Sequence, residues 1–110
     1  MRGLLFTALW WFGTGAVLAQ GPLINEVVPG GGDGPDWIEV YNAGPKTIDL
    51  QGYALVSLGR THRIDAAMPI APCGHQVLWC DRHPEAGPDH LDLKLQREGG
   101  SVLLIGPDRR

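Results

Sequence analysis

Glycine and proline interrupt this 110-residue chain so often that long helices are excluded over most of its length. All nine prolines and thirteen of the sixteen glycines lie after residue 19. Proline lacks a backbone donor and fixes φ, while glycine destabilises helix interiors, so helices rarely tolerate many of either. The segments between these breaks are short and apolar or alternating. The sequence therefore predicts short strands joined by turns.

Seven or eight such segments follow one another at intervals of about 8–12 residues, a spacing typical of a β-sandwich. The clearest covers 37–41, where Trp37, Glu39 and Tyr41 alternate with Ile38 and Val40. The other strands are expected over 23–28, over 48–57 with a bend at Gly52, around Ile64, and over 76–80, 91–95 and 102–105. Residues 81–89 are expected to form a polar loop without a helix, because they are rich in proline and glycine.

The first nineteen residues differ from the rest of the chain. Arg2 gives a short positive start, residues 3–18 carry no charge, and the VLA sequence at 17–19 places small residues where a signal peptidase cleaves. This order is typical of a secretory signal peptide. A membrane-spanning helix needs ~20 apolar residues, and this run is shorter and interrupted by glycine. We therefore expect cleavage after Ala19 and a secreted, periplasmic or cell-surface protein.

Residues 20–110 then form one small domain with an acidic balance. Residues 20–110 contain eight Lys and Arg residues and twelve Asp and Glu residues, which gives a net charge of −4. Arg2 is not counted because it is removed with the signal peptide. Nucleic-acid binding depends on basic surfaces that neutralise phosphates, so this charge argues against a nucleic-acid partner.

The only cysteines are Cys73 and Cys80, although an exported chain would enter an oxidising compartment. A strand over 76–80 alone would span ~13 Å, whereas a disulfide requires Cα atoms ~4.4–6.8 Å apart. Two free thiols are therefore expected, with an intermolecular bridge as the alternative.

Five motifs occur in order along the domain: Ile24 to Val27 (INEV), Asp36 to Asn42 (DWIEVYN), Ile48 to Tyr53 (IDLQGY), Ile70 to Gly74 (IAPCG) and Val77 to Asp81 (VLWCD). Together with His90, Leu93 to Leu95 (LKL) and Glu98 to Gly100 (EGG), they resemble a lamin-tail domain of the bacterial secreted type, over about residues 23–108. The residues that match the fold motif are Asn25, Glu26, Asp36, Trp37, Glu39, Asn42, Gly52, Trp79 and His90.

The resemblance implies an all-β, immunoglobulin-like β-sandwich that serves as a non-catalytic module. Such domains usually continue past the GPD turn at 106–108 into one or two further strands, whereas this chain ends at Arg110. We therefore expect an open sheet edge, either from a truncated reading frame or closed by a strand of another chain. Truncation is the favoured explanation.

The acidic residues near the N-terminal end of the domain are explained by structural roles. Glu26 and Glu39 could act as paired acids, since glycosidases need two carboxyls ~5–9.5 Å apart, but no other catalytic group accompanies them. Asp33 and Asp36 lack the spacing of a calcium loop, so they are expected to order a turn. Asn25 and Glu26 are expected to link strands by bonds from side chain to backbone.

The string Cys80, His83 and His90 resembles part of a zinc site, but a fourth ligand is missing, and His62 has no identifiable partner. Trp37 and Trp79 are expected in the core, on opposite sheets; an exposed aromatic platform for sugar or peptide is the alternative. We expect no catalytic, metal or cofactor site.

Two functional classes follow. The preferred one is an exported, non-catalytic immunoglobulin-like module for protein or cell-surface interaction or scaffolding. The alternative is the N-terminal fragment of a secreted hydrolase or nuclease that carries this domain as an accessory.

Overall fold

The computed structural model describes residues 5–9, 21–30 and 34–107. Position 33 and the expected cleavage point after residue 19 lie outside these ranges. The described residues form nine strands and one 3₁₀ turn: β1 (Leu5–Leu9), β2 (Pro22–Val28), β3 (Asp36–Asn42), β4 (Ile48–Asp49), β5 (Ala54–Ser57), β6 (Arg60–Arg63), β7 (Pro69–Ile70), β8 (His75–Cys80), η1 (Pro84–Ala86) and β9 (Ser101–Ile105).

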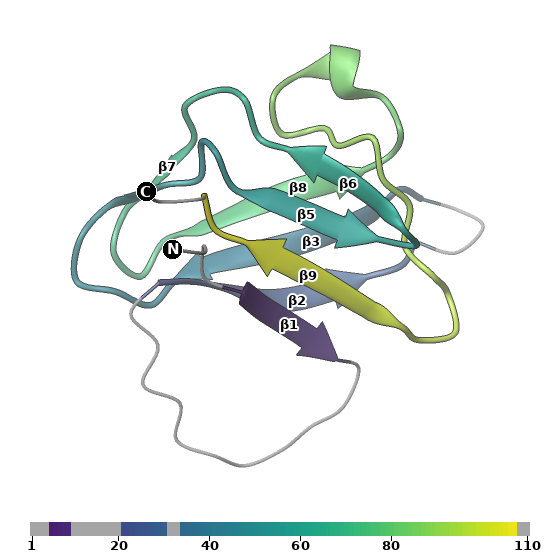
Figure 1. Cartoon of the computed structure of the whole chain (residues 1–110), viewed down its shortest axis with the longest axis horizontal. Helices are drawn as coiled ribbons and strands as arrows, with labels where there is room; N and C mark the ends of the chain where they lie inside the picture. The colour runs from purple at the N-terminus through teal and green to yellow at the C-terminus, as the bar shows by residue number, and fades with distance from the viewer. Residues whose placement is uncertain (1–4, 10–20, 31–33, 108–110) are drawn as a thin grey trace.

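The strands form two layers (Figure 1). The front sheet has the order β1-β9-β5-β6, the rear sheet has the order β2-β3-β8, and β4 pairs with β7 in a separate ribbon. Every pair of neighbouring strands is antiparallel. The predicted all-β sandwich is therefore confirmed. Among the described residues, no helix has the length and apolar character needed to cross a membrane.

The core fills the space between the two sheets. Strand β3 alternates as predicted, so Ile38 and Val40 are completely buried while Trp37, Glu39 and Tyr41 are half-buried on the other face. From the front sheet, Leu55 and Leu104 are register partners and are also fully buried. Burying one such aliphatic side chain stabilises the fold by roughly 1.5–3 kcal/mol.

Residues 48–57 do not form one bent strand. They divide into β4 and β5, which belong to different sheets. Gly52 lies in the turn between them with φ of +91°, a left-handed conformation that favours glycine. Its N–H donates to the carbonyl of Ile64 at 2.8 Å, so the turn is held against the end of β6. Ile64 is buried just after β6 rather than at the centre of a strand.

The strand predicted over 91–95 is also absent, although its alternation of burial is present. Leu91, Leu93 and Leu95 are buried. However, the backbone of this segment bonds to scattered groups: the N–H of Leu95 donates to Asp36, and the carbonyl of Lys94 accepts from Ser57. Because these backbone groups do not bond to a single adjacent strand, the segment packs its leucines in the core without forming a regular series of β-sheet hydrogen bonds. Residues 81–89 are irregular as predicted, except for the single turn η1.

Strand β1 lies within the predicted signal segment and pairs with β9 along its whole length. The register runs from Leu5 opposite Ile105 to Leu9 opposite Ser101. The sheet edge that was expected to be open is thus occupied, in the full chain, by the chain's own N-terminal residues.

Strand β3 has a buried polar side chain at each end. Asp36 accepts hydrogen bonds from the N–H groups of Gly30 and Leu95, both at 2.8 Å. Asn42 donates to the carbonyls of Lys46 and Ile70 and accepts from the N–H of Gly44. Each end of β3 is therefore bonded to segments distant in sequence.

Replacing Asp36 with alanine is expected to lower the free energy of unfolding by about 2–4 kcal/mol, because two N–H groups lose a charged acceptor in a buried place. Urea denaturation followed by tryptophan fluorescence measures this loss. Asp65→Ala is the matched control, since Asp65 is exposed, and should change stability by less than about 0.5 kcal/mol. Equal effects of the two substitutions would contradict the proposed anchoring role.

Candidate functional site

The outward side of the rear sheet carries most of the residues singled out from the sequence. We call it the aromatic face, and it comprises Leu23, Glu26 and Val28 of β2, Trp37, Glu39 and Tyr41 of β3, and His75, Val77 and Trp79 of β8. Outward positions of an antiparallel sheet are commonly polar. Here aromatic and aliphatic side chains predominate.

The prediction that Trp37 and Trp79 lie on opposite sheets is wrong. They are register partners on the neighbouring strands β3 and β8, and both are half-buried on the aromatic face. Residues opposite each other in an antiparallel pair have Cβ atoms ~4.5–5.5 Å apart, so the two side chains emerge side by side. This arrangement fits the alternative of an outward aromatic platform.

Next along the same strands, Tyr41 is the register partner of His75. Their ring centroids are 4.8 Å apart with planes tilted by 34°. A hydrogen bond with Cys73, followed by the negative charge that thiol can carry, raises the pKa of the Tyr41 phenol above its ordinary value. Tyr41 therefore stays a neutral hydrogen-bonding group at physiological pH.

The polar centre of the aromatic face is Glu39. Its Oε1 accepts a hydrogen bond of 2.8 Å from Asn25 and lies 3.9 Å from Nε2 of His75. Asn25 reaches Glu39 because β2 has an irregular register between Ile24 and Glu26, and a bulge of this kind turns a side chain toward the partner strand. The predicted link from Asn25 is therefore present, but it joins two side chains rather than a side chain and the backbone.

Glu26 and Glu39 lie directly opposite each other in the register of β2 and β3. The two acids considered as a pair in the sequence are thus neighbours on adjacent strands. Glu39 is engaged by Asn25, and Ser57 gives its hydroxyl to the carbonyl of Lys94 rather than to a histidine. The arrangement places hydrogen-bonding side chains and aromatic rings together on one surface.

The two thiols differ in environment. Cys80 is fully buried beside the core and Cys73 is exposed, and neither is in a disulfide. Burial, followed by the negative charges of Asp36 and Asp81, raises the pKa of Cys80 to about 12. Because the thiolate is the reactive form, Cys80 is chemically inert in the folded protein.

With a thiol-specific chromogenic disulfide reagent, the native protein is expected to react at one thiol and the denatured protein at two. Cys73→Ser should abolish the reaction of the native protein, whereas Cys80→Ser should leave it unchanged. Fast reaction of the native Cys73→Ser variant would show that Cys80 is accessible, contrary to its burial.

His90 lies beside β8, where it forms an isolated bridge with Trp79. Its Nδ1 is 2.6 Å from Oδ2 of Asp81. Partial burial raises the pKa of Asp81, but the hydrogen bonds from His90 and from the N–H of His83 lower it more, so the pKa lies below its usual value. Since an ionised carboxylate only accepts, the Nδ1 of His90 must donate.

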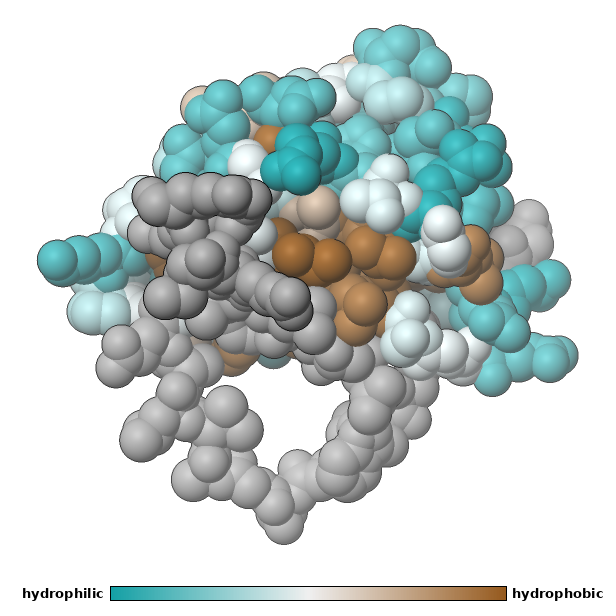
Figure 2. Space-filling model, viewed as in Figure 1, coloured by the Kyte–Doolittle hydropathy of each residue, from teal (hydrophilic) through white to brown (hydrophobic). Residues whose placement is uncertain are grey.

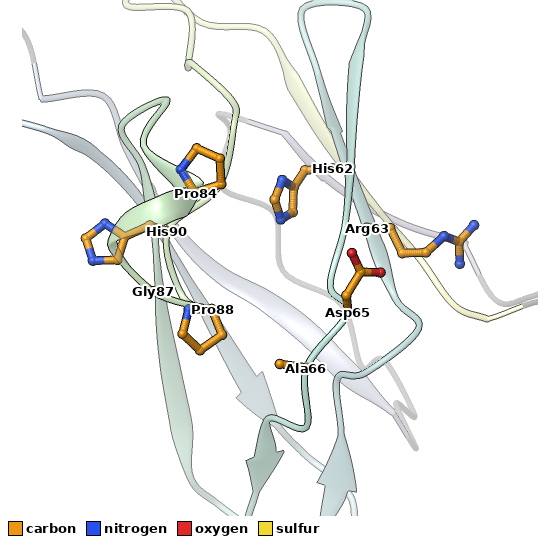
Figure 3. A pocket seen from close by; sticks show the side chains of 8 residues that line it. All are labelled: His62, Arg63, Asp65, Ala66, Pro84, Gly87, Pro88 and His90. Atoms are coloured by element: carbon orange, nitrogen blue, oxygen red, sulfur yellow. The ribbon is translucent and has the colours of Figure 1, made fainter.

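A shallow pocket of about 190 Å³ adjoins His90 and is lined also by His62, Pro84 and Pro88 (Figure 3). Nδ1 of His62 accepts from the N–H of Asp92 at 3.2 Å, so the neutral ring carries its proton on Nε2. The side chain of Arg63 extends away from the loop that carries Pro84 and His90 (Figure 3). The pocket thus has few polar groups that a ligand could contact.

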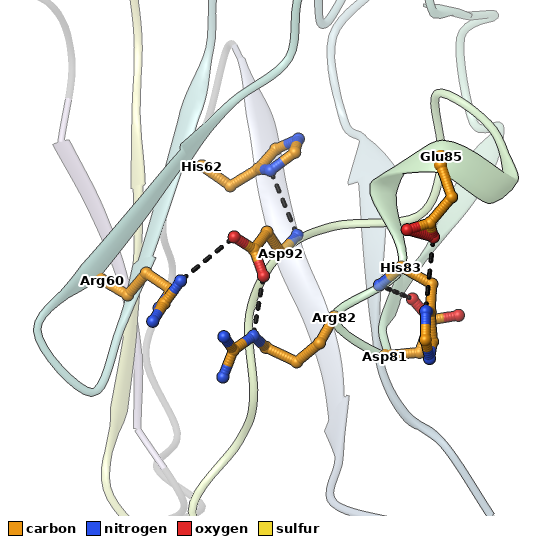
Figure 4. Close-up of polar contacts among 7 residues, drawn as sticks. All are labelled: Arg60, His62, Asp81, Arg82, His83, Glu85 and Asp92. Carbon is orange, nitrogen blue, oxygen red and sulfur yellow. Dashed lines mark hydrogen bonds and ion pairs between the residues drawn. The ribbon is translucent and has the colours of Figure 1, made fainter.

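Asp92 joins two arginines at the surface (Figure 4). Arg82 lies 2.7 Å and Arg60 3.1 Å from its carboxylate oxygens, and these contacts, first the hydrogen bond from Arg82, lower the pKa of Asp92. The sequence did not reveal this group or the partner of His62, because Arg60 and His62 are 32 and 30 positions from Asp92, and Arg82 is ten positions from it across a loop.

The suspected zinc ligands are dispersed. Cys80 faces the core, His83 pairs with Glu85 at 3.3 Å, and His90 pairs with Asp81 (Figure 4 shows the first of these pairs). In the part of the chain that the structure describes, no group of three His, Cys, Asp or Glu side chains is arranged to hold a metal ion.

Asp81→Asn is expected to lower the free energy of unfolding at pH 7. The folded-state pKa of Asp81 is below the unfolded value of about 3.9, so its stabilising effect is complete above that value and is lost as the pH falls through the folded-state pKa. The stability difference between wild type and Asp81→Asn should therefore shrink below about pH 4. Urea titrations at several pH values measure it.

Glu85→Gln is the control for this pH series. Glu85 and His83 are each 70% exposed, so their ion pair should contribute almost nothing. If the difference in free energy of unfolding between wild type and Asp81→Asn stayed constant down to about pH 3, the lowered folded-state pKa of Asp81 would be contradicted.

Two facing antiparallel sheets, with aromatic side chains on the outward side of one of them, define an immunoglobulin-like module. The family model for the lamin tail domain matches residues 19–108. The chain therefore belongs to the lamin tail domain family, whose members are non-catalytic immunoglobulin-like modules. Comparison with curated proteins and with solved structures gave no match.

Proposed function

We propose that this protein is an exported, non-catalytic immunoglobulin-like module that binds a protein or cell-surface partner through its aromatic face. The observation that carries the proposal is the outward placement of Trp37, Trp79 and Tyr41 on adjacent strands of one sheet. Tryptophan and tyrosine are enriched among the residues that dominate binding energy at interfaces. They lose little conformational entropy on binding, because they have few rotatable bonds.

The chemistry of the face favours a partner with both apolar and donor groups. Glu26 is exposed and Glu39 lies between the two aromatic pairs, so carboxylate acceptors sit among the rings. The exposed ring of His75, whose side chain is 47% accessible, adds a second polar contact. The outward side of a sheet with this composition suits recognition of another surface better than enclosure of a small molecule.

Export rests on residues 1–19, whose charge and hydropathy order is that of a signal peptide. A module outside the cell would meet surface polymers and proteins directly. The exposed and half-buried rings of the aromatic face would then be the first groups to contact them.

The test uses protein recovered from outside the producing cells, which is expected to begin at Gln20. Fluorescently labelled protein should bind intact cells of the producing organism saturably. Trp79→Thr should weaken this binding at least about tenfold, as expected for a dominant interface aromatic. Threonine keeps a strand-favouring side chain at this position, and circular dichroism checks that the fold is retained.

Val56→Thr is the matched control, because Val56 is a half-buried, outward residue of β5 in the other sheet. It should change binding by less than about twofold. The proposal is refuted if the producing cell retains residues 1–19 on the protein. It is also refuted if Trp79→Thr and wild type bind cells equally well.

A further inference from the structure

Sheet edges expose unpaired backbone groups, and natural proteins block them with charges, prolines, bulges or covering segments. Strand β6, at one edge of the front sheet, carries Arg60 and Arg63, both exposed. These two charges oppose pairing with another strand. This edge is therefore protected.

Both edges of the rear sheet are also protected. Strand β2 begins with Pro22 and has the irregular register next to Asn25. Along β8, the N–H of Trp79 donates to Asp89 at 2.8 Å and its carbonyl accepts from Leu91 at 2.7 Å, so residues 89–91 cover that strand. Each of these three edges is thus closed by a feature of the domain itself.

Strand β9 has no such protection. Residues Ser101–Ile105 contain no charge and no proline. Val102 and Leu104 are fully buried, and Leu103 and Ile105 are half-buried on the outward side. Figure 2 shows an apolar area over the middle of the front sheet, with hydrophilic side chains above it. Among the described strands, β1 alone pairs with the side of β9 that faces away from β5, and β1 belongs to the segment expected to be removed.

We propose that β9 is a strand-accepting edge, occupied by β1 in the uncleaved chain and by β9 of a second copy after cleavage. The pairing is antiparallel about a two-fold axis at Leu103. This inference rests on the export step of the proposed function. The backbone N–H and C=O groups of β9 that β1 satisfies become free on cleavage, and the same groups of a second β9 satisfy them.

A second copy fits this edge for two reasons. Strand β1 shows that the edge takes an uncharged, antiparallel strand of five residues, and β9 is itself uncharged and five residues long. Pairing of identical antiparallel strands is also self-complementary, as two-fold symmetry requires. The product is one continuous sheet with three strands from each copy.

The association stops at two copies. Once β9 pairs with β9, the outer strands of the joined sheet are the two β6 strands with their Arg60 and Arg63 side chains. Charged edges of this kind oppose further addition. The edge chemistry therefore favours a closed dimer over a fibre.

The experiment starts from the full chain, produced without export so that residues 1–19 are retained, with a site-specific protease sequence inserted between residues 10 and 20. Light scattering after size exclusion should give a monomer before cleavage. After cleavage and washing away of the released segment, the mass should double. A synthetic peptide that carries residues 5–9 with a lysine added at each end should compete for β9. In excess, it should return the protein to a monomer.

Two substitutions locate the interface. Leu103→Lys places like charges opposite each other at the two-fold axis, so dimer formation should weaken at least about tenfold. Val56→Lys is the matched control, because Val56 is the register partner of Leu103 on the interior strand β5; it should change dimer formation by less than about twofold.

A dimer before cleavage would overturn the proposal, because β1 would then not be the occupant. A monomer after cleavage, open-ended aggregates, or dimers unaffected by Leu103→Lys would also overturn it. The readout is oligomeric state, so the proposal can fail while cell binding through the aromatic face persists. If the producing cell retains residues 1–19, the proposed export fails even though cleavage in vitro still exposes β9.

Discussion

The hydrogen bonds at the two ends of β3 are the constraint on which the rest of the structure depends. Asp36 and Asn42 are buried, and every buried side-chain polar atom among the described residues has a partner. Leaving such groups unpaired costs about 1–3 kcal/mol each. A shift of β3 by one residue would break these bonds and move Ile38 and Val40 from the core to the surface. The register of the central strand is therefore fixed at both ends and in the middle.

The same alternation produces the aromatic face. With Ile38 and Val40 inside, Trp37, Glu39 and Tyr41 must lie outside, and β8 follows the register with Trp79 opposite Trp37. The core and the candidate binding surface thus share one physical cause. The nearby histidine and carboxylate pairs, such as His90 with Asp81, have a different role, because they connect loops at the edge of the rear sheet.

The front sheet is completed differently. Its strand β9 acquires a neighbour from the N-terminal segment, whereas β6 relies on arginine charges. If the N-terminal segment is removed as proposed, the backbone groups of β9 that now pair with β1 become exposed. The aromatic face and β9 belong to opposite layers, so the proposed binding and the proposed strand pairing do not compete for the same surface.

The sequence by itself determined the fold class and the alternation of the regular strands, because turn residues and alternation act locally. The expectation that Trp37 and Trp79 lie in the core is wrong, since both are half-buried on the outward side. The sequence correctly predicted the strands near 22–28, 36–42, 75–80 and 101–105, whereas the bend predicted at Gly52 within one strand is a turn between two strands of different sheets. Only the tertiary structure decided that Trp37 and Trp79 share a sheet, that 91–95 forms no ladder, and that His62 meets Asp92. These outcomes depend on which segments become neighbours across the fold, and strand parity carries no information about pairing partners.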